Sequence, residues 1–147
     1  MNKMANLVQI KEHKDIARTK SIEVFPDPKT ALILTYQHTG VTNTPIVSVG
    51  DIVAIGQKIA DSKERVSAPV HSPISGKIVK IGDIYNSCYS ECSEAIWIEN
   101  DGKKTKDKTL IPISESELEK TANDVLIKRI REAGIIGLGG AGFPTSV

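Results

Sequence analysis

Hydrophobic and polar residues alternate in short runs between residues 31 and 99, which is the pattern of β-strands that bury one face. The alternation is clearest in residues 77–81 (KIVKI) and 94–99 (EAIWIE). The runs assigned to single strands or to extended chain are residues 31–36, 65–70, 77–81 and 94–99. Short strands at intervals of roughly ten residues are typical of a small barrel or sandwich.

Turn signals divide these strands. Residues 44–60 are rich in β-branched residues, but Gly-Asp at 50–51 and Gly-Gln at 56–57 predict tight turns that split the segment into three short strands. Further turns are predicted at 75–76 (SG) and at 100–102 (NDG). This part of the chain is therefore predicted to be mainly β.

Near the C-terminal end, the apolar residues recur with the spacing of a helix instead of alternating with polar residues. Ser114 and Glu117 have the spacing of a capping box, in which each side chain bonds the backbone N–H of the other residue. Gly134 is well placed as the left-handed residue that ends a helix. The apolar residues that then share one face are Leu118, Ala122, Val125, Leu126, Ile130 and Ala133. The pattern predicts one helix of about five turns.

The change of period indicates a domain organisation. Residues 101–108 carry four lysines and have the character of a solvated connector. We therefore predict a polar N-terminal extension at residues 1–21, a β domain at 22–105, and a helix with the start of another domain at 106–147.

Composition and charge exclude several classes of function. Aliphatic residues dominate the 39% hydrophobic content, since aromatic residues make up only 4%. With 19 basic and 18 acidic residues, the net charge of +1 gives no footprint for nucleic acid. No apolar run approaches the ~20 residues that span a bilayer, and the N-terminus lacks the apolar segment of a secretory signal. A cytoplasmic protein without direct membrane insertion is expected.

The strongest chemical signal is a glycine-rich run at the end of the chain. Four of the six residues 137–142 are glycine, so backbone N–H groups can close on an anionic ligand without a Cβ in the way. Gly137, Gly139 and Gly142 also satisfy the G-x-G-x-x-G pattern. The predicted element before them is a helix, not the strand that a Rossmann fingerprint requires, so the Rossmann interpretation is rejected.

Several stretches together resemble one family. They are residues 36–40 (YQHTG), 45–59 (PIVSVGDIVAIGQKI), 66–78 (VSAPVHSPISGKI), 95–102 (AIWIENDG) and 130–145 (IREAGIIGLGGAGFPT). Their order and spacing resemble the N-terminal part of the RnfC subunit of the Rnf electron-transport complex. The same resemblance extends to the cobalamin reductase of propanediol utilisation and the electron-transfer protein associated with proline reductase. It covers the chain from about residue 22 to residue 147.

The resemblance implies a fold. In that family a barrel-sandwich hybrid domain, similar to biotinyl and lipoyl carriers, precedes an α/β flavin- and NADH-binding domain similar to the flavoprotein subunit of respiratory complex I. A ubiquitin-like domain and a ferredoxin-like domain with two [4Fe–4S] clusters follow. The chain is therefore expected to be a fragment or a truncated reading frame that holds the hybrid domain and the start of the flavin domain.

The resemblance also implies a cofactor site, with no catalytic side chain assigned. It places the glycine run against FMN and NADH. Physically, Phe143 offers an apolar face, and Thr145 can cap a following helix whose N-terminus favours phosphate. The implied cofactor-contacting residues are Gly137, Gly139, Gly140, Gly142, Phe143 and Thr145. Without the rest of the pocket, the run is expected to be a disordered tail that binds no cofactor.

Two functions follow. The first is an RnfC-like electron-transfer flavoprotein that passes electrons between NADH, FMN and iron–sulfur clusters, and of which this chain alone is inactive. The second is a non-catalytic docking module of an electron-transfer or reductase complex. Both imply other subunits of a membrane-associated or soluble complex as partners, with peripheral membrane association through that complex.

Carrier and metal chemistry have weaker signals. Lys63 precedes Pro69 by six residues, but the Met-Lys-Met triplet of biotin carriers is missing, so a solvated hairpin lysine is predicted. Cys88 and Cys92 are the only cysteines, and two thiolates neither complete a zinc site nor match ferredoxin spacing. Two reduced thiols in a loop are favoured, with a redox-active pair as the minor hypothesis.

The remaining candidates are interpreted as structural. His13, His38 and His71 are isolated and suggest no hydrolase triad; His71 is predicted to be a loop imidazole that bonds backbone. Trp97 is predicted to lie in the core. The carboxylates Glu115, Glu117 and Glu119 are predicted to favour the helix start rather than to form an acid–base pair.

Overall fold

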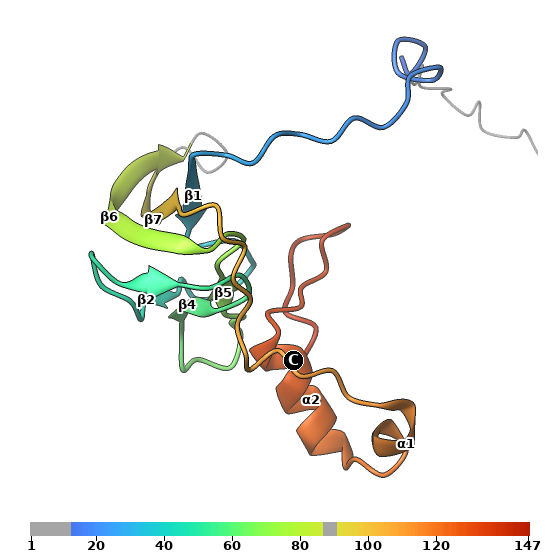
Figure 1. Ribbon diagram of the computed structural model, residues 1–147. Helices are drawn as coiled ribbons and strands as arrows, with labels where there is room; N and C mark the ends of the chain where they lie inside the picture. Colours follow the sequence, from blue (N-terminus) through green and yellow to red (C-terminus); the bar gives the residue numbers. More distant parts are fainter. Residues whose placement is uncertain (1–12, 87–90) are drawn as a thin grey trace, which may run out of the picture.

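The computed structural model describes residues 13–86 and 91–147, and within these ranges it has seven β-strands and two α-helices (Figure 1). Four strands form one antiparallel sheet in the order β1 (Thr30–Leu34), β7 (Glu91–Asn100), β6 (Gly76–Asn86) and β3 (Ile52–Val53). Three form a smaller antiparallel sheet in the order β2 (Thr44–Pro45), β4 (Lys58–Asp61) and β5 (Val70–His71). The mainly β prediction is confirmed.

Long strands β6 and β7 make the larger sheet curl around the core (Figure 1). Their register shifts between Ile78 and Lys80, where Val79 has no partner across the pair. An extra residue of this kind bends a strand and increases its twist. The bend lets one sheet cover the smaller sheet, which is why the two sheets enclose a single core.

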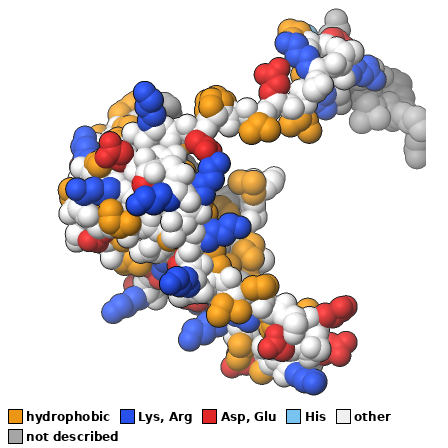
Figure 2. Space-filling view, viewed as in Figure 1, with side chains coloured by type: hydrophobic (Ala, Val, Ile, Leu, Met, Phe, Trp, Pro, Cys, Tyr) orange, Lys and Arg blue, Asp and Glu red, His pale blue; other side chains and the backbone are white. Residues whose placement is uncertain are grey.

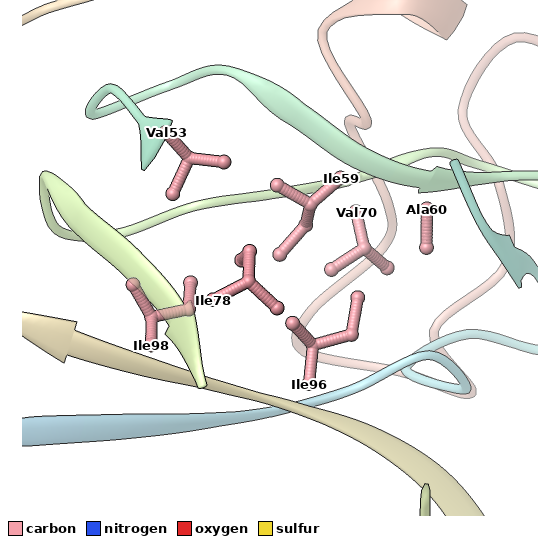
Figure 3. Packing of buried hydrophobic residues seen from close by; sticks show 7 residues of the cluster. All are labelled: Val53, Ile59, Ala60, Val70, Ile78, Ile96 and Ile98. Atoms are coloured by element: carbon pink, nitrogen blue, oxygen red, sulfur yellow. The ribbon is translucent and has the colours of Figure 1, made fainter. Parts of the chain in front are cut away.

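The core lies between the two sheets and is aliphatic, as the composition indicated (Figure 3). Ile96 and Ile98 point inward from β7. Ile78 from β6 meets them. The buried residues of this cluster are Val53, Ile59, Ala60, Val70, Ile78, Ile96 and Ile98. Each fully buried isoleucine contributes about 1.5–3 kcal/mol to folding.

Trp97 is not in the core, contrary to the sequence prediction. It lies between the inward-facing Ile96 and Ile98 on β7, so its side chain faces the other side of the sheet and is only half-buried. Lys80 Nζ lies 4.4 Å from the centroid of its ring, in a cation–π contact. The strand itself was predicted correctly, but Trp97 occupies a position whose side chain lies on the face of the sheet away from the core.

The predicted turn at residues 75–76 is also wrong. Gly76 is the first residue of β6 and pairs with both Asn100 of β7 and Val53 of β3. A Cβ on Gly76 would lie 1.9 Å from the carbonyl oxygen of Glu99. Glycine is therefore required here for close approach of two backbones, not for a turn. The turns at Gly50, Gly56 and Gly102 are confirmed, and each of these glycines has a positive φ.

The predicted five-turn helix is broken into two. Helix α1 spans Glu115–Leu118 and α2 spans Asn123–Glu132, with Ala122 in an extended conformation between them. The predicted apolar face lies largely in solvent, so no packing holds a continuous helix together. The Thr121 hydroxyl bonds the Glu117 carbonyl, which competes with helical bonding. The capping box at Ser114 and the left-handed Gly134 are both confirmed.

The segment before the first strand and the segment after the last strand differ in their contacts with the sheets. Residues 20–29 run as extended chain away from the strands (Figure 1). In contrast, the lysine-rich connector adds a short parallel bridge, because the Ile55 N–H bonds the Thr105 carbonyl and the Asp107 N–H bonds the Ile55 carbonyl. The predicted domain limits at residues 21 and 105 stay predictions.

Candidate functional site

The glycine run forms a closed loop, so the expectation of a disordered tail is wrong. An isolated bridge joins Ile136 to Pro144, and the Gly137 N–H bonds the Phe143 carbonyl at 2.9 Å. The Gly142 N–H bonds the Gly137 carbonyl at 3.2 Å, and Pro144 is buried. The loop thus carries its own hydrogen bonds across its base. We call residues 136–144 the glycine loop.

The predicted cofactor-contacting residues lie around the exposed tip and base of this loop. Gly137, Gly139, Gly140, Phe143 and Thr145 are exposed, while Gly142 is partly buried. The Thr145 N–H bonds the Ile135 carbonyl at 3.0 Å and helps to close the base. Within the described part of the chain, the N–H groups of Gly139, Ala141 and Phe143 donate to no protein acceptor. The tip therefore presents backbone donors to solvent.

The loop docks on residues 37–40, about a hundred residues away in sequence. The Thr39 N–H donates to the Gly142 carbonyl at 3.1 Å, and the Thr39 hydroxyl donates to the Ala141 carbonyl. Gly142 has φ of +68°, which a residue with a side chain rarely adopts. The sequence singled out both segments, and the structure brings them together.

His38 links this contact to the two sheets β1–β7, which we call the barrel. Its imidazole is buried, and its Nε2 accepts a bond from the Ala68 N–H at 3.1 Å. Its Nδ1 lies 3.1 Å from the Thr39 carbonyl oxygen, so the proton sits on Nδ1 and donates there. The Asn43 amide, which bonds the carbonyls of Ala68 and Thr35, packs beside it. His38 therefore has a structural role, because it joins two segments singled out in the sequence, residues 36–40 and 66–78.

His71 lies where helix α2 meets the barrel. It is in strand β5 and not in the predicted loop. Burial lowers the pKa of its imidazole and outweighs the raising effect of a hydrogen bond with the Glu132 backbone, which is the kind of bond predicted. A Cβ on Gly134 would lie 3.2 Å from this ring and 2.4 Å from the Pro69 carbonyl oxygen. Gly134 therefore lets the end of α2 approach the barrel closely.

Four charged side chains join the end of α2 to strand β4. Arg131 bonds Asp61 through both guanidinium nitrogens, at 2.7 and 3.1 Å, and also donates to the Ser62 carbonyl. Lys58 bonds Asp61 at 2.9 Å and Glu132. No sequence motif predicts this network. The only signal in the sequence is the pair of basic residues, Arg129 and Arg131, in the last helical turn, where the helix dipole favours positive charge.

The network sets the ionisation of Asp61. Burial raises the pKa of its carboxyl, but hydrogen bonds from Arg131 and Lys58 outweigh that effect and lower the pKa to about 2. The side chain of Asp61 is 22% exposed and that of Arg131 is 23% exposed. A bidentate, charge-assisted pair of this kind is stronger than a single surface ion pair.

The lowered pKa gives a pH-dependent stability. Because the folded pKa lies below the usual value of 3.8, the contribution of Asp61 is complete above about pH 4 and is lost as pH falls through about 2. We expect Asp61→Asn to reduce the free energy of unfolding by about 1–2 kcal/mol at pH 6. The difference from the unchanged protein should be much smaller at pH 2 and should vanish below it. Urea unfolding at several pH values checks this, and a difference that stays constant down to pH 2 would contradict it.

An open groove of about 740 Å³ runs along α2, which contributes Arg129, Ile130 and Glu132 to its lining. Its other walls are residues 107–111 on one side, and Gly56, Lys58 of β4 and His71 of β5 on the other. Leu110 and Ile130 give it apolar walls, while Arg129 bonds the Ile111 carbonyl at 2.7 Å. On the face shown in Figure 2, basic and acidic side chains are interspersed, so that face has no continuous field of one sign.

The other predicted candidates lie apart from the glycine loop. Lys63 is exposed in the connection between β4 and β5. Cys92 is exposed on β7, and Cys88 lies outside the described residues. His13 is exposed with φ of +50°. In residues 13–86 and 91–147, no three metal-ligating side chains cluster, and no helix is long and apolar enough to cross a membrane.

Two of the three carboxylates lie at the start of α1 as predicted, and the prediction is wrong for Glu119 because the helix is short. Glu115 and Glu117 lie in the first turn, and Glu119 is the residue at which the helix ends. The Ser114 hydroxyl and N–H both donate to Glu117, at 2.7 and 3.0 Å. These bonds lower the pKa of the Glu117 carboxyl.

Comparisons with known proteins extend the sequence resemblance. The model of the RnfC barrel sandwich hybrid domain matches residues 3–103. The chain is 41% identical over 136 residues to the RnfC subunit of a proton-translocating ferredoxin:NAD(+) oxidoreductase complex of Clostridium ljungdahlii. It is 37% identical over 120 residues to the RnfC subunit of a Na(+)-translocating ferredoxin:NAD(+) oxidoreductase complex of Acetobacterium woodii.

These similarities cover most of the chain and a small part of each relative. The first match takes in 92% of this chain and 29% of the relative, and the second takes in 82% and 26%. The RnfC subunit of an ion-translocating oxidoreductase complex of Rhodobacter capsulatus is 32% identical, again over 92% of this chain and 26% of the relative. The chain therefore spans little more than a quarter of the length of these relatives.

Proposed function

The chain belongs to the family of the RnfC barrel sandwich hybrid domain, and we propose that it serves as the N-terminal part of an RnfC-like electron-transfer flavoprotein. The membership confirms the resemblance seen in the sequence and the hybrid fold that it implied. In the complete protein, electrons would pass between NADH, FMN and iron–sulfur clusters. The α/β flavin domain and these cofactors are part of the proposal.

The glycine loop is the feature that most supports this function. It is closed at its base, held on the barrel by Thr39, and exposed at its tip. A Cβ built on Gly139 meets nothing within 4 Å, so the backbone at the tip is open to a planar ligand. The N–H groups of Gly139 and Ala141 suit an anionic or carbonyl group of a cofactor.

In this function the residues of the loop bind and orient FMN. The glycines allow close backbone approach, and the half-exposed Phe143 ring supplies an apolar contact. FMN, when bound, supplies hydride and single-electron chemistry. The barrel provides a rigid support for the loop, because sites on rigid elements are held more closely than sites on free loops.

The partners follow from the relatives. Those proteins are named as subunits of ion-translocating oxidoreductase complexes, so we propose other subunits of such a complex as partners. The association with the membrane would then be peripheral and made through the complex.

The second candidate is a non-catalytic docking module. Exposed apolar side chains beside the edge strand β3 favour it, since Ile46, Val49 and Ile52 are 55%, 60% and 69% exposed. A docking module would use this surface without cofactor contact at the glycine loop.

A chimera separates the two functions. Residues 1–147 would replace the matched N-terminal stretch of the Clostridium ljungdahlii protein, leaving the remainder of that protein intact. After reconstitution with FMN and gel filtration, we expect about one FMN per chain, as in the parent protein treated in parallel. A folded chimera that retains no FMN, beside a parent that does, would favour the docking module.

A further inference from the structure

The glycine loop is connected to the barrel at two places. One is the contact of Thr39 with Ala141 and Gly142, near the end of the loop. The other lies before the loop, where Arg131 in the last turn of α2 binds Asp61 of β4, and where Glu132 pairs with Lys58 and bonds His71 through its backbone. A segment fixed at both ends has far fewer orientations than one fixed at a single point.

The chain between Arg131 and the loop is short and tightly bonded. The Gly134 N–H bonds the Arg131 carbonyl at 2.9 Å, and the Ile135 N–H bonds the Ile130 carbonyl at 3.4 Å. Gly134 fits against the Pro69 carbonyl and His71 only because it has no Cβ. A displacement of Arg131 is therefore expected to displace the start of the loop as well.

The Asp61–Arg131 pair is the strongest member of the charge network. Arg131 makes two bonds to the Asp61 carboxylate and further contacts with the Ser62 carbonyl and the Ser67 hydroxyl. By contrast, Glu132 is 43% exposed, so its pair with Lys58 is more screened by solvent. Planar arginine also suits a bidentate carboxylate bond better than lysine does.

We infer that Asp61 and Arg131 are positioning residues that clamp the glycine loop in the orientation in which it meets its cofactor. With the clamp closed, the loop is held at both ends. With the clamp open, only the more exposed Lys58–Glu132 pair and the contacts of Glu132 and Gly134 with His71 still hold the start of the loop, so it pivots more readily about the Thr39 contact. The importance of that orientation for cofactor binding rests on the proposed function, but the clamp itself does not.

Hydrogen exchange of the 147-residue chain tests the clamp. We expect Arg131→Gln and Asp61→Asn each to speed exchange of the amides of Gly137, Gly142 and Thr145 by about tenfold. Amides of β6 and β7 should keep their rates. Lys128→Gln removes the same charge from an exposed position of the same helix, and it should leave the loop amides unchanged.

A double variant distinguishes a pair from two independent residues. If Asp61 and Arg131 act through each other, Asp61→Asn combined with Arg131→Gln should exchange no faster than either single variant. Unchanged loop exchange in Arg131→Gln would overturn the inference. So would equal acceleration of the β6 and β7 amides, or single effects that multiply in the double variant.

The exchange measurement needs no cofactor, so it tests whether Asp61 and Arg131 hold the loop regardless of whether the chimera binds FMN. In a chimera that binds FMN, Arg131→Gln should weaken FMN affinity by about tenfold and Lys128→Gln should not. Equal FMN affinity of the two variants would overturn the role of the clamp in cofactor positioning.

Discussion

Gly76→Ala is expected to lower the free energy of unfolding by about 3 kcal/mol, because it forces two paired backbones apart. The added Cβ would lie 1.9 Å from the carbonyl oxygen of Glu99 and 2.8 Å from its carbonyl carbon. Neither atom belongs to a flexible side chain. Gly76 also joins three strands of the larger sheet, so any shift disturbs the pairing of β6 with both neighbours.

Gly82→Ala is the matched control, because Gly82 lies on the same strand and a Cβ there meets only the end of the Lys80 side chain, at 3.8 Å. We expect its effect to stay within about 0.5 kcal/mol. Urea unfolding followed by Trp97 fluorescence measures both variants. Similar stabilities for the two alanine variants would contradict the close backbone contact at Gly76.

The second large effect is on cofactor binding. In the chimera, Gly139→Val is expected to weaken FMN affinity by about a hundredfold, because a branched side chain would stand where the cofactor approaches the backbone. Since the space around this Cβ position is empty and Gly139 has no positive φ, stability should change by less than about 0.5 kcal/mol. Loss of binding without loss of stability identifies a ligand-facing position.

Gly82→Val adds the same side chain on β6, away from the glycine loop, and serves as the control for affinity. It should bind FMN as the unchanged chimera does, measured by the quenching of flavin fluorescence. If Gly139→Val binds FMN equally well, the tip of the loop does not face the cofactor.

Sequence patterns predicted the parts of this fold that depend on interactions between residues close together in the sequence. The alternation of residues 94–99 indicated strand β7. The capping box at Ser114 and the left-handed Gly134 marked where helical structure begins and ends. In each case the interaction that determines the structure is made between residues close together in the sequence.

The sequence predictions failed where residues far apart in the sequence determine the structure. Gly76 was predicted in a turn because its requirement comes from Glu99 across the sheet. The helix was predicted as continuous because its apolar face was assumed to be covered, whereas it lies largely in solvent.

The site was predicted in part for the same reason. The glycine loop and residues 37–40 were each recognised, but nothing in the sequence showed that Thr39 holds Gly142. The Asp61–Arg131 pair joins residues 70 apart, and neither residue forms part of a short motif with its partner. Only the folded barrel brings them together.

Amide exchange of the chimera with and without FMN is the most direct test of the central claim that the glycine loop is the cofactor loop of this protein. We predict that FMN slows exchange of the Gly139 and Ala141 amides by at least about tenfold, while amides on β3 keep their rates. Protection that appears elsewhere in the chimera, with the exchange of the loop amides unchanged, would contradict the claim.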